Sequence, residues 1–504
     1  MKRTRLILLP ITLVAALSSC SLDNSDGYKI VETRFTYKDY AKHSAYMSIC
    51  PSVGNSKILV VPIWFTDSDD YIDEDYREDV REDIELAYLG TSEQTGWESV
   101  KSYYYKDSFG KANMDGVVTK WFECGQPSSD FYKSEAQTYE LLGKAVEWYK
   151  KEYQVSNMQD FDKNKDGYLD GVMLIYAAPD YQSARARYND RYNMWAYTSW
   201  TGDYPSLSNP TTNAFFWASY DFMYSAEKSL ERSGLTEYSR GDTRFCNVDA
   251  HTFIHEMGHV FGLSDYYDYG GVSSPSAGFS MQDYNVGAHD PYSRLSLGWG
   301  TAIVPNRTVT LTVKPVEENG EMVILSPNYT GSPFDEYIIL ELYTPTGLNK
   351  FDVEHNYSGY YPTGSSSAGV RVWHVDGRLA KIDYNPRTGQ WYIGSITSEP
   401  TSSGSSFIMH ATSNTNAGDR AINYAGSYDY NELELIRNDT SYSYNSYDSL
   451  TNDSLFYTGD EFSMELFHNQ FVNGSLLNNG KNLGWEVTFD SVSEEGMTIT
   501  CKKI

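Results

Sequence analysis

The chain contains the stretch His251-Thr252-Phe253-Ile254-His255-Glu256-Met257-Gly258-His259-Val260-Phe261-Gly262-Leu263-Ser264-Asp265, which includes the pattern His-Glu-x-x-His. Apolar residues surround the two histidines and predict a helix, for which Gly262 is a natural stop. On that helix His255 and His259 stand four residues apart and share one face. Both imidazoles can therefore bind one metal ion, and zinc is the metal that this pattern favours.

The same stretch supplies a candidate third ligand. The pattern continues as HExxHxxGxxD, in which Gly262 can turn the chain sharply and return Asp265 to the metal. Another arrangement takes a glutamate from a later helix, but no glutamate occurs between Glu256 and Glu317. Asp265 is therefore the favoured third ligand. Three residues stay open as weaker substitutes, namely Asp268, Asp283 and His289.

Three protein ligands leave one coordination position of zinc open for water, which is typical of catalytic sites. Zinc lowers the pKa of this water and polarises a substrate carbonyl. Glu256 lies next to a ligand without being one, so it is the candidate general base that takes a proton from the water and delivers it to the leaving amine. The pattern predicts an enzyme, a zinc metalloendopeptidase acting on protein or peptide substrates.

Two residues that follow the metal-binding pattern are candidates for further roles. Met281 comes after a glycine turn and resembles the Met-turn of metzincins, in which a methionine side chain packs beneath the metal. Tyr284 is a candidate oxyanion donor, and an ordinary packing role is the alternative for it.

These features together resemble one family, the secreted bacterial zinc metallopeptidases typified by immune inhibitor A. The similarity extends from about Lys57 to Asp376 and is carried by HExxHxxGxxD, by Met281 and by weaker segments at 102–111, 194–197, 291, 297–299 and 370–376. The resemblance implies a metzincin-like catalytic domain, a β-rich C-terminal domain, zinc, calcium and proteolysis outside the cell. Much of the long pro-region of that family has no counterpart in this sequence.

Hydrophobic patterning divides the chain near residue 300. Residues 57–300 combine short buried runs, as at 58–65 and 172–176, with helical spacing at about 74–88 and 135–153. They predict an α+β catalytic domain, which the resemblance makes zincin- or metzincin-like.

The remaining residues have a different texture. Residues 301–504 show short alternating runs separated by turn residues, and they predict an all-β, sandwich-like C-terminal domain. Within it, the part at 427–454 is rich in Tyr, Ser, Asn and Asp, and it predicts long surface loops.

Residues 1–20 resemble a lipoprotein-type signal peptide. Three basic residues precede an apolar run that is too short to span a bilayer, and Leu-Ser-Ser-Cys at the end resembles a bacterial lipobox. We expect acylation of Cys20, with an ordinary cleaved export signal as the alternative. Residues 21–56 predict a tether or a short pro-segment. The protein is expected at the cell surface, or secreted, with membrane contact only through the lipid anchor.

The charge balance excludes one class of partner. The 504 residues include 40 Lys and Arg against 68 Asp and Glu, and the formal charge is −28. Nucleic-acid binding needs clustered cations that face phosphates, so it is excluded. The hydrophobic fraction of 40% indicates a folded globular chain, which we expect to be a monomer.

Residues 162–170, Asp-Lys-Asn-Lys-Asp-Gly-Tyr-Leu-Asp, place oxygen atoms at alternate positions with glycine at the sixth. This spacing is typical of a calcium loop, although position twelve is Met173 and the closing glutamate of an EF-hand is missing. A plain acidic turn is the alternative. The predicted structural calcium site uses Asp162, Asn164, Asp166, the carbonyl oxygen of Tyr168, and Asp170.

Four cysteines follow the predicted signal and permit up to two disulfides; they are Cys50, Cys124, Cys246 and Cys501. Cys50 is also a weak candidate for an inhibitory zinc thiolate, whereas a buried cysteine is the more common case. His374 and Asp376 are expected to form a structural or domain-interface pair. Residues 193–200, around Trp195, predict either an edge strand that pairs with an extended peptide or an ordinary half-buried strand.

A second function of another class stays open. The chain has 44 tyrosines, whose rings can stack on sugars. It could therefore be a surface adhesin or glycan-binding protein in which a metal-dependent hydrolase domain is secondary. A metal site of this kind can also hydrolyse bonds other than the peptide bond.

Overall fold

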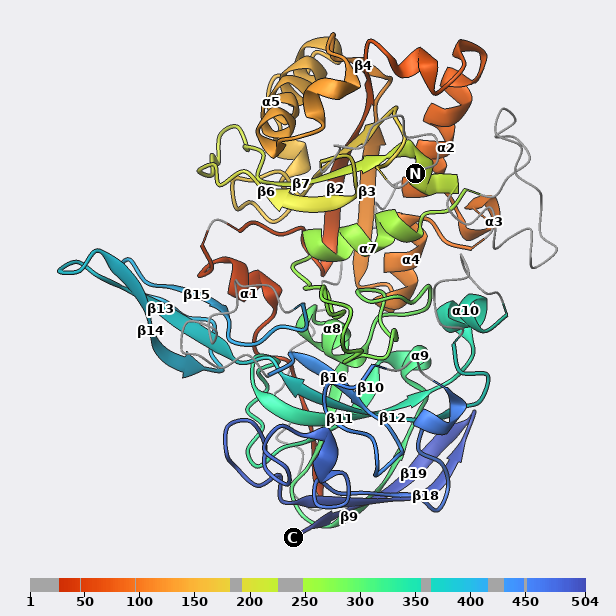
Figure 1. The fold of residues 1–504 in the computed structure, drawn as a ribbon, viewed down its shortest axis with the longest axis vertical. Helices are drawn as coiled ribbons and strands as arrows, with labels where there is room; N and C mark the ends of the chain where they lie inside the picture. Colours follow the sequence, from red (N-terminus) through yellow and green to blue (C-terminus); the bar gives the residue numbers. More distant parts are fainter. Residues whose placement is uncertain are drawn as a thin grey trace, which may run out of the picture.

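The computed structural model describes residues 27–45, 47–95, 97–181, 193–224, 248–354, 364–415, 430–447 and 451–504. These residues form a mixed α/β protein with four β-sheets (Figure 1). The expected mixture of helices and strands is confirmed at this level. None of the described helices combines the length and hydrophobicity that a bilayer crossing requires.

A mainly parallel sheet occupies the upper half of Figure 1 in the order β3-β2-β5-β7-β6, and β4 also pairs with β2. Its strands are β2 (Gly54–Trp64), β3 (Ala112–Val118), β4 (Phe122–Glu123), β5 (Val172–Tyr176), β6 (Tyr197–Trp200) and β7 (Ala214–Ser219). Only β6 is antiparallel to its neighbour, and it forms an edge of the sheet. The buried runs predicted at 58–65 and 172–176 are confirmed as strands.

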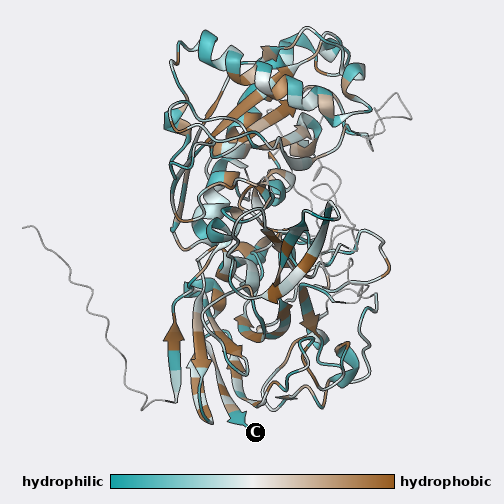
Figure 2. Ribbon diagram, turned by 90° about the vertical axis from the view of Figure 1, so that its left-hand side faces the viewer, coloured by the Kyte–Doolittle hydropathy of each residue, from teal (hydrophilic) through white to brown (hydrophobic). Residues whose placement is uncertain are grey.

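Helices cover both faces of this sheet, which explains why its strands are apolar on both sides. Ile58 and Val60 point into a core shared with α2, α4 and α7, while Leu59 and Val61 point into a core shared with α5. Figure 2 shows the hydrophobic strands enclosed by helices whose outer surfaces are polar. The helices of this half are α2 (Arg77–Leu89), α3 (Ser92–Thr95), α4 (Val100–Asp107), α5 (Glu135–Glu152), α7 (His251–Val260) and α8 (Pro291–Ser296).

Two stacked sheets form the lower half. One has the order β1-β8-β10-β11-β12-β16, the other has the order β17-β18-β19-β9, and their facing side chains share one core. The strands are β1 (Tyr28–Val31), β8 (Thr301–Pro305), β9 (Val309–Val313), β10 (Glu321–Leu325), β11 (Glu336–Tyr343), β12 (Gly369–Asp376), β16 (Leu433–Ile436), β17 (Glu461–Phe462), β18 (Trp485–Ser493) and β19 (Gly496–Lys503). Short helices α9 (Val316–Asn319) and α10 (Lys350–Glu354) lie between strands.

The larger of these sheets is buried on both faces. Its second face packs on α8 and the chain before it, where Tyr292 and Leu295 contact Ile339 and Trp373 in one apolar cluster. The two halves of the protein therefore share a hydrophobic core.

A third, three-stranded sheet projects from the side of the lower half (Figure 1). It consists of β13 (Leu379–Asn385), β14 (Gln390–Thr397) and β15 (Phe407–His410). Strand β14 is largely exposed, and Trp391 and Tyr392 are each 51% exposed.

Residues 27–56 are an integral part of the fold, which their polar composition did not indicate. Strand β1 pairs antiparallel with β8, and the following helix α1 (Tyr37–Ala41) places Tyr37 in the core of the upper half. The described structure therefore begins well before the first strand of the parallel sheet.

The prediction of long surface loops at 427–454 is wrong at one place. Residues Leu433–Ile436 form the buried strand β16, which pairs with β12. The four residues Leu-Glu-Leu-Ile are too short a run to stand out in a polar segment, and only the pairing with β12 reveals them.

The described cysteines do not form disulfides. Cys50, Cys124 and Cys501 are free, and Cys246 lies outside the described residues. Cys50 is fully buried beside α7, and burial raises the pKa of its thiol. It contributes to packing and does not line the metal pocket described below.

Candidate metal centre

Helix α7 carries the predicted metal ligands and packs against β6 and β7 of the parallel sheet. It ends where the chain turns at Gly262, which has φ of +106°, and the N–H of Leu263 donates to the carbonyl of Gly258 at 3.0 Å. A Cβ atom at Gly262 would lie 2.9 Å from the Tyr37 ring, so the turn requires glycine. The turn brings Asp265 back toward α7, as the sequence predicted.

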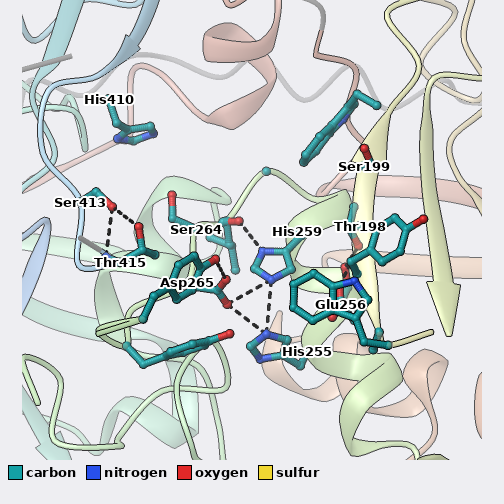
Figure 3. A pocket seen from close by; sticks show the side chains of 18 of the residues that line it. Thr198, Ser199, His255, Glu256, His259, Ser264, Asp265, His410, Ser413 and Thr415 are labelled. Atoms are coloured by element: carbon teal, nitrogen blue, oxygen red, sulfur yellow. Dashed lines mark hydrogen bonds and ion pairs between the residues drawn. The ribbon is translucent and has the colours of Figure 1, made fainter. Parts of the chain in front are cut away.

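Two backbone carbonyls fix the orientation of the imidazole rings. His255 Nδ1 lies 2.7 Å from the carbonyl oxygen of Met281, and His259 Nδ1 lies 2.8 Å from that of Leu263. A carbonyl oxygen only accepts, so each Nδ1 carries a proton and donates. The Nε2 atoms of both rings are left to face the same point (Figure 3).

Asp265 completes a triangle of ligand atoms. The two Nε2 atoms are 3.3 Å apart, and Asp265 Oδ1 lies 3.1 Å from that of His255 and 3.2 Å from that of His259. Tetrahedral zinc with bonds of about 2.0–2.1 Å places its ligand atoms about 3.3 Å apart. Asp265 Oδ1 is buried and has no hydrogen-bond partner besides these two imidazole nitrogens. The donor set and its spacing fit a divalent metal ion.

The charges of these groups are strongly coupled. Burial alone would raise the pKa of Asp265, but the two imidazoles hold it well below its ordinary value. Burial alone would lower the pKa of His259, but the adjacent Asp265 carboxylate raises it to about 9. Without a metal, a proton therefore occupies the cluster at neutral pH, and a metal ion has to displace it.

Glu256 is buried beside the ligands and lines the same pocket. Burial raises its pKa, while the two imidazoles oppose this shift. Thr198 on β6 donates its hydroxyl to Glu256, with Oγ1 3.0 Å from Oε2. The carboxyl is thus held at the pocket wall by the edge strand, without belonging to the ligand triangle (Figure 3).

Met281 is fully buried in the core around α7, and its carbonyl orients His255 as described above. Tyr284 is 47% exposed and lines the pocket. Its ring centroid lies 5.2 Å from that of Tyr267, a residue that sequence reasoning missed. Tyr269, also missed, donates its hydroxyl to Asp265 Oδ2 at 2.5 Å, while Oδ1 faces the two imidazoles.

The three substitute ligands lie in other environments. Asp268 accepts backbone N–H groups of Gly270, Val272 and Ser273. Asp283 bonds with Ser276 and Gly278, and His289 Nδ1 lies 2.7 Å from a carboxylate oxygen of Asp107. Among the described residues, only His255, His259 and Asp265 bring three such ligand atoms within 4.8 Å of one another.

The predicted calcium loop has the sharp turn that its glycine suggests, since Gly167 has φ of +89°. Its carboxylates already accept backbone N–H groups. The two oxygens of Asp162 accept from Asp166 and Gly167, each at 3.0 Å, and Asp170 accepts from Lys57 and Lys163. Calcium at this loop stays a prediction.

The metal centre opens into a pocket of about 680 Å³ whose walls come from distant parts of the chain (Figure 3). Strand β6 forms one wall, and the exposed Trp195 lies beside it. No spacing in the sequence identifies the opposite wall, because its residues lie about 150 to 210 positions from α7. They are Tyr40, Met47, His410, Ser413 and Thr415.

Comparison with known proteins adds no family assignment. No protein-family model matches the chain, and no curated protein sequence matches it. The resemblance drawn from short motifs therefore rests on those motifs and on the geometry of the site.

His374 and Asp376, expected as a structural pair, are buried on β12 away from this pocket. His374 Nε2 lies 3.0 Å from Glu336 Oε1, and Asp376 accepts two hydrogen bonds from Arg378. Each is therefore paired with another residue of the lower half, His374 with Glu336 and Asp376 with Arg378.

Proposed function

We propose that this protein is a zinc metalloendopeptidase of the metzincin-like type, similar to immune inhibitor A. The observation that carries the proposal is the convergence of two imidazole Nε2 atoms and one carboxylate oxygen within 3.3 Å, beside a buried glutamate and at the floor of an open pocket. His255, His259 and Asp265 are the ligands. Three ligands leave room for a fourth group, as in catalytic zinc sites.

The chain's own residues provide the proton transfer. A bound zinc ion would supply Lewis-acid chemistry, activating water and polarising the scissile carbonyl. Glu256 accepts the proton of the attacking water and returns it to the leaving amine. Thr198 holds one carboxylate oxygen of Glu256 and so limits its rotation. Tyr284 lines the pocket and is the candidate donor to the oxyanion that develops on the substrate.

The substrate is an extended polypeptide. Strand β6 is the edge of its sheet and runs beside α7, so a peptide can add to it through backbone hydrogen bonds. None of the described lining residues is Lys or Arg, whereas Glu135 and Asp268 add negative charge to the pocket. Strongly acidic peptides are therefore poor substrates.

Cleavage of a peptide library tests the reaction class. The protein with zinc should cut internal peptide bonds, lose activity on treatment with a zinc chelator and regain it when zinc is restored. If cleavage continues after full chelation, when metal analysis finds less than a tenth of an equivalent of zinc per chain, zinc is removed from the proposal. Absence of any cleavage by zinc-loaded protein would remove the peptidase.

The proposal also includes the location of the enzyme and a stabilising calcium ion. Acylation at Cys20, which lies outside the described residues, would hold the mature protein at the cell surface. Calcium bound at residues 162–170 would stabilise the fold outside the cell. Mass spectrometry of the N-terminal peptide distinguishes a diacylglyceryl cysteine from a plain cleaved terminus.

Glycan binding is a second candidate function, and one observation favours it. Tyr384, Trp391 and Phe407 group on the projecting sheet, with centroid separations of 5.0 and 5.1 Å, and Trp391 is half exposed. Aromatic rings presented in this way can stack on sugars. Retardation of the protein in polysaccharide gels, lost in Trp391→Ala and kept in Glu256→Gln, would support it.

A further inference from the structure

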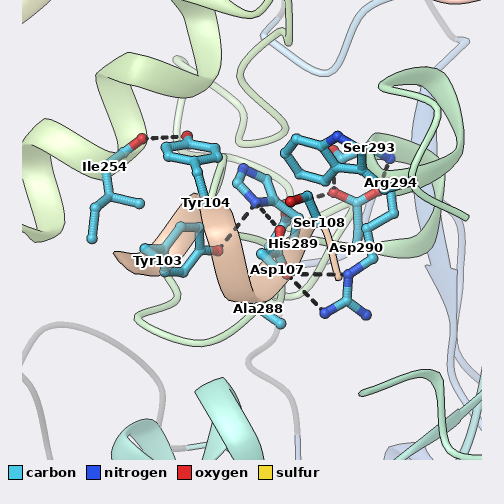
Figure 4. A network of polar contacts seen from close by, with 12 residues as sticks. Tyr103, Tyr104, Asp107, Ser108, Ile254, Ala288, His289, Asp290, Ser293 and Arg294 are labelled. Atoms are coloured by element: carbon cyan, nitrogen blue, oxygen red, sulfur yellow. Dashed lines mark hydrogen bonds and ion pairs between the residues drawn. The ribbon is translucent and has the colours of Figure 1, made fainter. Parts of the chain in front are cut away.

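A buried polar network lies beside helix α7 and connects it with α4 and with residues 282–294 (Figure 4). Gln282 donates its Nε2 to the backbone carbonyl of His255 at 3.1 Å. Its Oε1 lies 3.2 Å from His289 Nε2. His289 Nδ1 in turn lies 2.7 Å from Asp107 Oδ2. Gln282, His289 and Asp107 are each at most 1% exposed, so the solvent satisfies none of these groups.

The donor and acceptor groups of this network determine which of its atoms carry protons. The carbonyl of His255 only accepts, so the amide nitrogen of Gln282 faces it and the amide oxygen faces His289. His289 Nε2 must therefore donate. Its Nδ1 faces a carboxylate that also accepts two bonds from Arg294, and a Tyr103 hydroxyl that donates to the carbonyl of Gly287, so it donates as well. His289 is thus a buried imidazolium.

The charges of the network balance. Burial alone would raise the pKa of Asp107, but Arg294 and His289 hold it at about 2. Arg294 also bonds with Glu317 at 2.9 Å, so two cations meet two carboxylates. Such paired and hydrogen-bonded ions are stable when buried. Removal of one member leaves its partner buried and unpaired, which strongly destabilises the fold.

The network approaches α7 so closely at Gly258 that a side chain at this position would not fit. A Cβ atom at Gly258 would lie 2.1 Å from Gln282 Oε1. The glycine inside the His-Glu-x-x-His pattern therefore admits the Gln282 amide against the helix. Beside it, Tyr104 donates its hydroxyl to the carbonyl of Ile254 at 2.6 Å. Two successive carbonyls of α7 are thus held from α4 and from the segment after Met281.

We propose that Gln282, oriented by the His289–Asp107 pair, is a positioning residue that fixes the rotation of α7 and so the angle at which His255 and His259 meet the metal. This inference rests on the proposed function. The Arg294–Glu317 pair extends the network into the C-terminal half, since Glu317 belongs to α9. Partners that orient metal ligands typically change metal affinity or activity about 10–100-fold when removed.

Cobalt(II) substitution of the full mature chain tests the inference, with Gln282→Met and Asp107→Asn as variants. The matched control is His374→Gln, which breaks another buried histidine–carboxylate pair, 3.0 Å long, in the C-terminal half. Both test variants should alter the visible bands of tetrahedral cobalt and lower kcat about 10–100-fold with KM within about twofold. The control should lower the melting temperature and leave the cobalt bands and kcat unchanged.

Three results overturn the inference, and they are distinguishable. If Gln282→Met and Asp107→Asn keep the cobalt bands and the kcat of the wild type, the network is only structural. The proposed metalloenzyme function would be unaffected by that result. Equal spectral and kinetic changes in His374→Gln would show a general loss of stability instead. A wild-type protein that binds neither cobalt nor zinc would remove the proposed function and this inference with it.

Discussion

At the scale of single residues, the decisive feature is the direction of two imidazole rings. The carbonyl oxygens of Met281 and Leu263 each accept a hydrogen bond from an Nδ1 atom, so both Nε2 atoms point at Asp265 Oδ1. Two ring nitrogens and a carboxylate oxygen gathered at one buried point need a positive charge between them, either a proton or a metal ion. This arrangement favours a metal site over a chance pair of core histidines.

Removal of one ligand should release the metal. His255→Ala leaves two of the three ligand atoms, so zinc stoichiometry by elemental analysis should fall from about one per chain to below a tenth. His374→Ala, which removes a buried histidine from β12, should keep one zinc per chain. Full zinc in His255→Ala would take His255 out of the ligand set.

The role of Tyr284 is tested by loss of its hydroxyl alone. If Tyr284 donates to the developing oxyanion, Tyr284→Phe should lower kcat about 100-fold and leave KM nearly constant, because the bond forms mainly in the transition state. Tyr204→Phe is the control, since Tyr204 is 87% exposed and does not line the pocket. An unchanged kcat in Tyr284→Phe would leave this tyrosine with a packing role.

The structure brings together the candidate ligands that lie close to one another in the chain. The spacing of His255, Glu256, His259 and Asp265 is set by one helix and one glycine turn, so local geometry suffices to bring them together. Tyr269 was missed because one more tyrosine among 44 has no distinctive spacing. A hydroxyl four residues after Asp265 is the signal that could have found it.

At the scale of secondary-structure elements, the loop at 162–170 contains carboxyl groups whose charged form is disfavoured by burial. Burial raises the pKa of Asp170 to about 8, and burial also raises that of Asp166. A calcium ion would relieve this cost by pairing with the carboxylates, even though they already hold backbone N–H groups.

Calcium should therefore stabilise the chain through this loop. At a calcium concentration about 100 times the dissociation constant, the free energy of unfolding should rise by about 2.7 kcal/mol, seen as a higher melting temperature. Asp166→Asn should reduce the calcium-dependent shift, while Asp69→Asn, an exposed acid elsewhere, should retain it. A wild-type melting temperature indifferent to calcium would leave the loop as an acidic turn.

Helix α2 contains a buried aspartate whose contribution to stability changes with pH in the opposite direction to that of an aspartate in an ion pair. Burial raises the pKa of Asp83 to about 7, and Tyr224 donates its hydroxyl to Oδ2. Between pH 4 and 7 the unfolded chain releases this proton while the folded chain retains it, so the free energy of unfolding falls as pH rises.

Asp83→Asn removes that dependence while it keeps the shape and the acceptor for Tyr224. Relative to the wild type, the variant should gain about 2–4 kcal/mol of stability at pH 8 and nothing at pH 4. Denaturant unfolding of both proteins at the two pH values measures this gain. A gain of equal size at pH 4 would show that the titration of Asp83 is not its cause.

At the scale of the whole molecule, the upper and lower halves depend on one another. They share the apolar cluster around Tyr292 and Trp373, and Arg294 of α8 pairs with Glu317 of α9. The wall of the pocket that contains His410 and Thr415 also comes from the C-terminal half. The proposed catalytic unit is therefore larger than the residues that carry its motif.

A chain that ends at residue 300 should fail to fold. Such a truncation exposes the apolar face of α8 and leaves Arg294 without one of its two carboxylates, which together cost several kcal/mol. We expect no cooperative thermal transition and no peptide hydrolysis by this fragment. A soluble fragment with full activity would show that the lower half contributes neither stability nor a pocket wall.

Sequence patterns did not predict these long-range contacts. Strands at 58–65 and 172–176 were predicted because each is a continuous apolar run. The pairing of β1 with β8, and the wall formed by Tyr40 and His410, depend on residues hundreds of positions apart. No local periodicity encodes such contacts, so only the folded chain reveals them.

The most direct test of the central claim separates metal binding from proton transfer. Glu256→Gln preserves the size of the side chain and the acceptor for Thr198, but it removes the base. The variant should bind one zinc per chain by elemental analysis and lose peptide hydrolysis by at least about 1,000-fold in kcat. Zinc-replete Glu256→Gln with wild-type kcat would contradict the proposed mechanism.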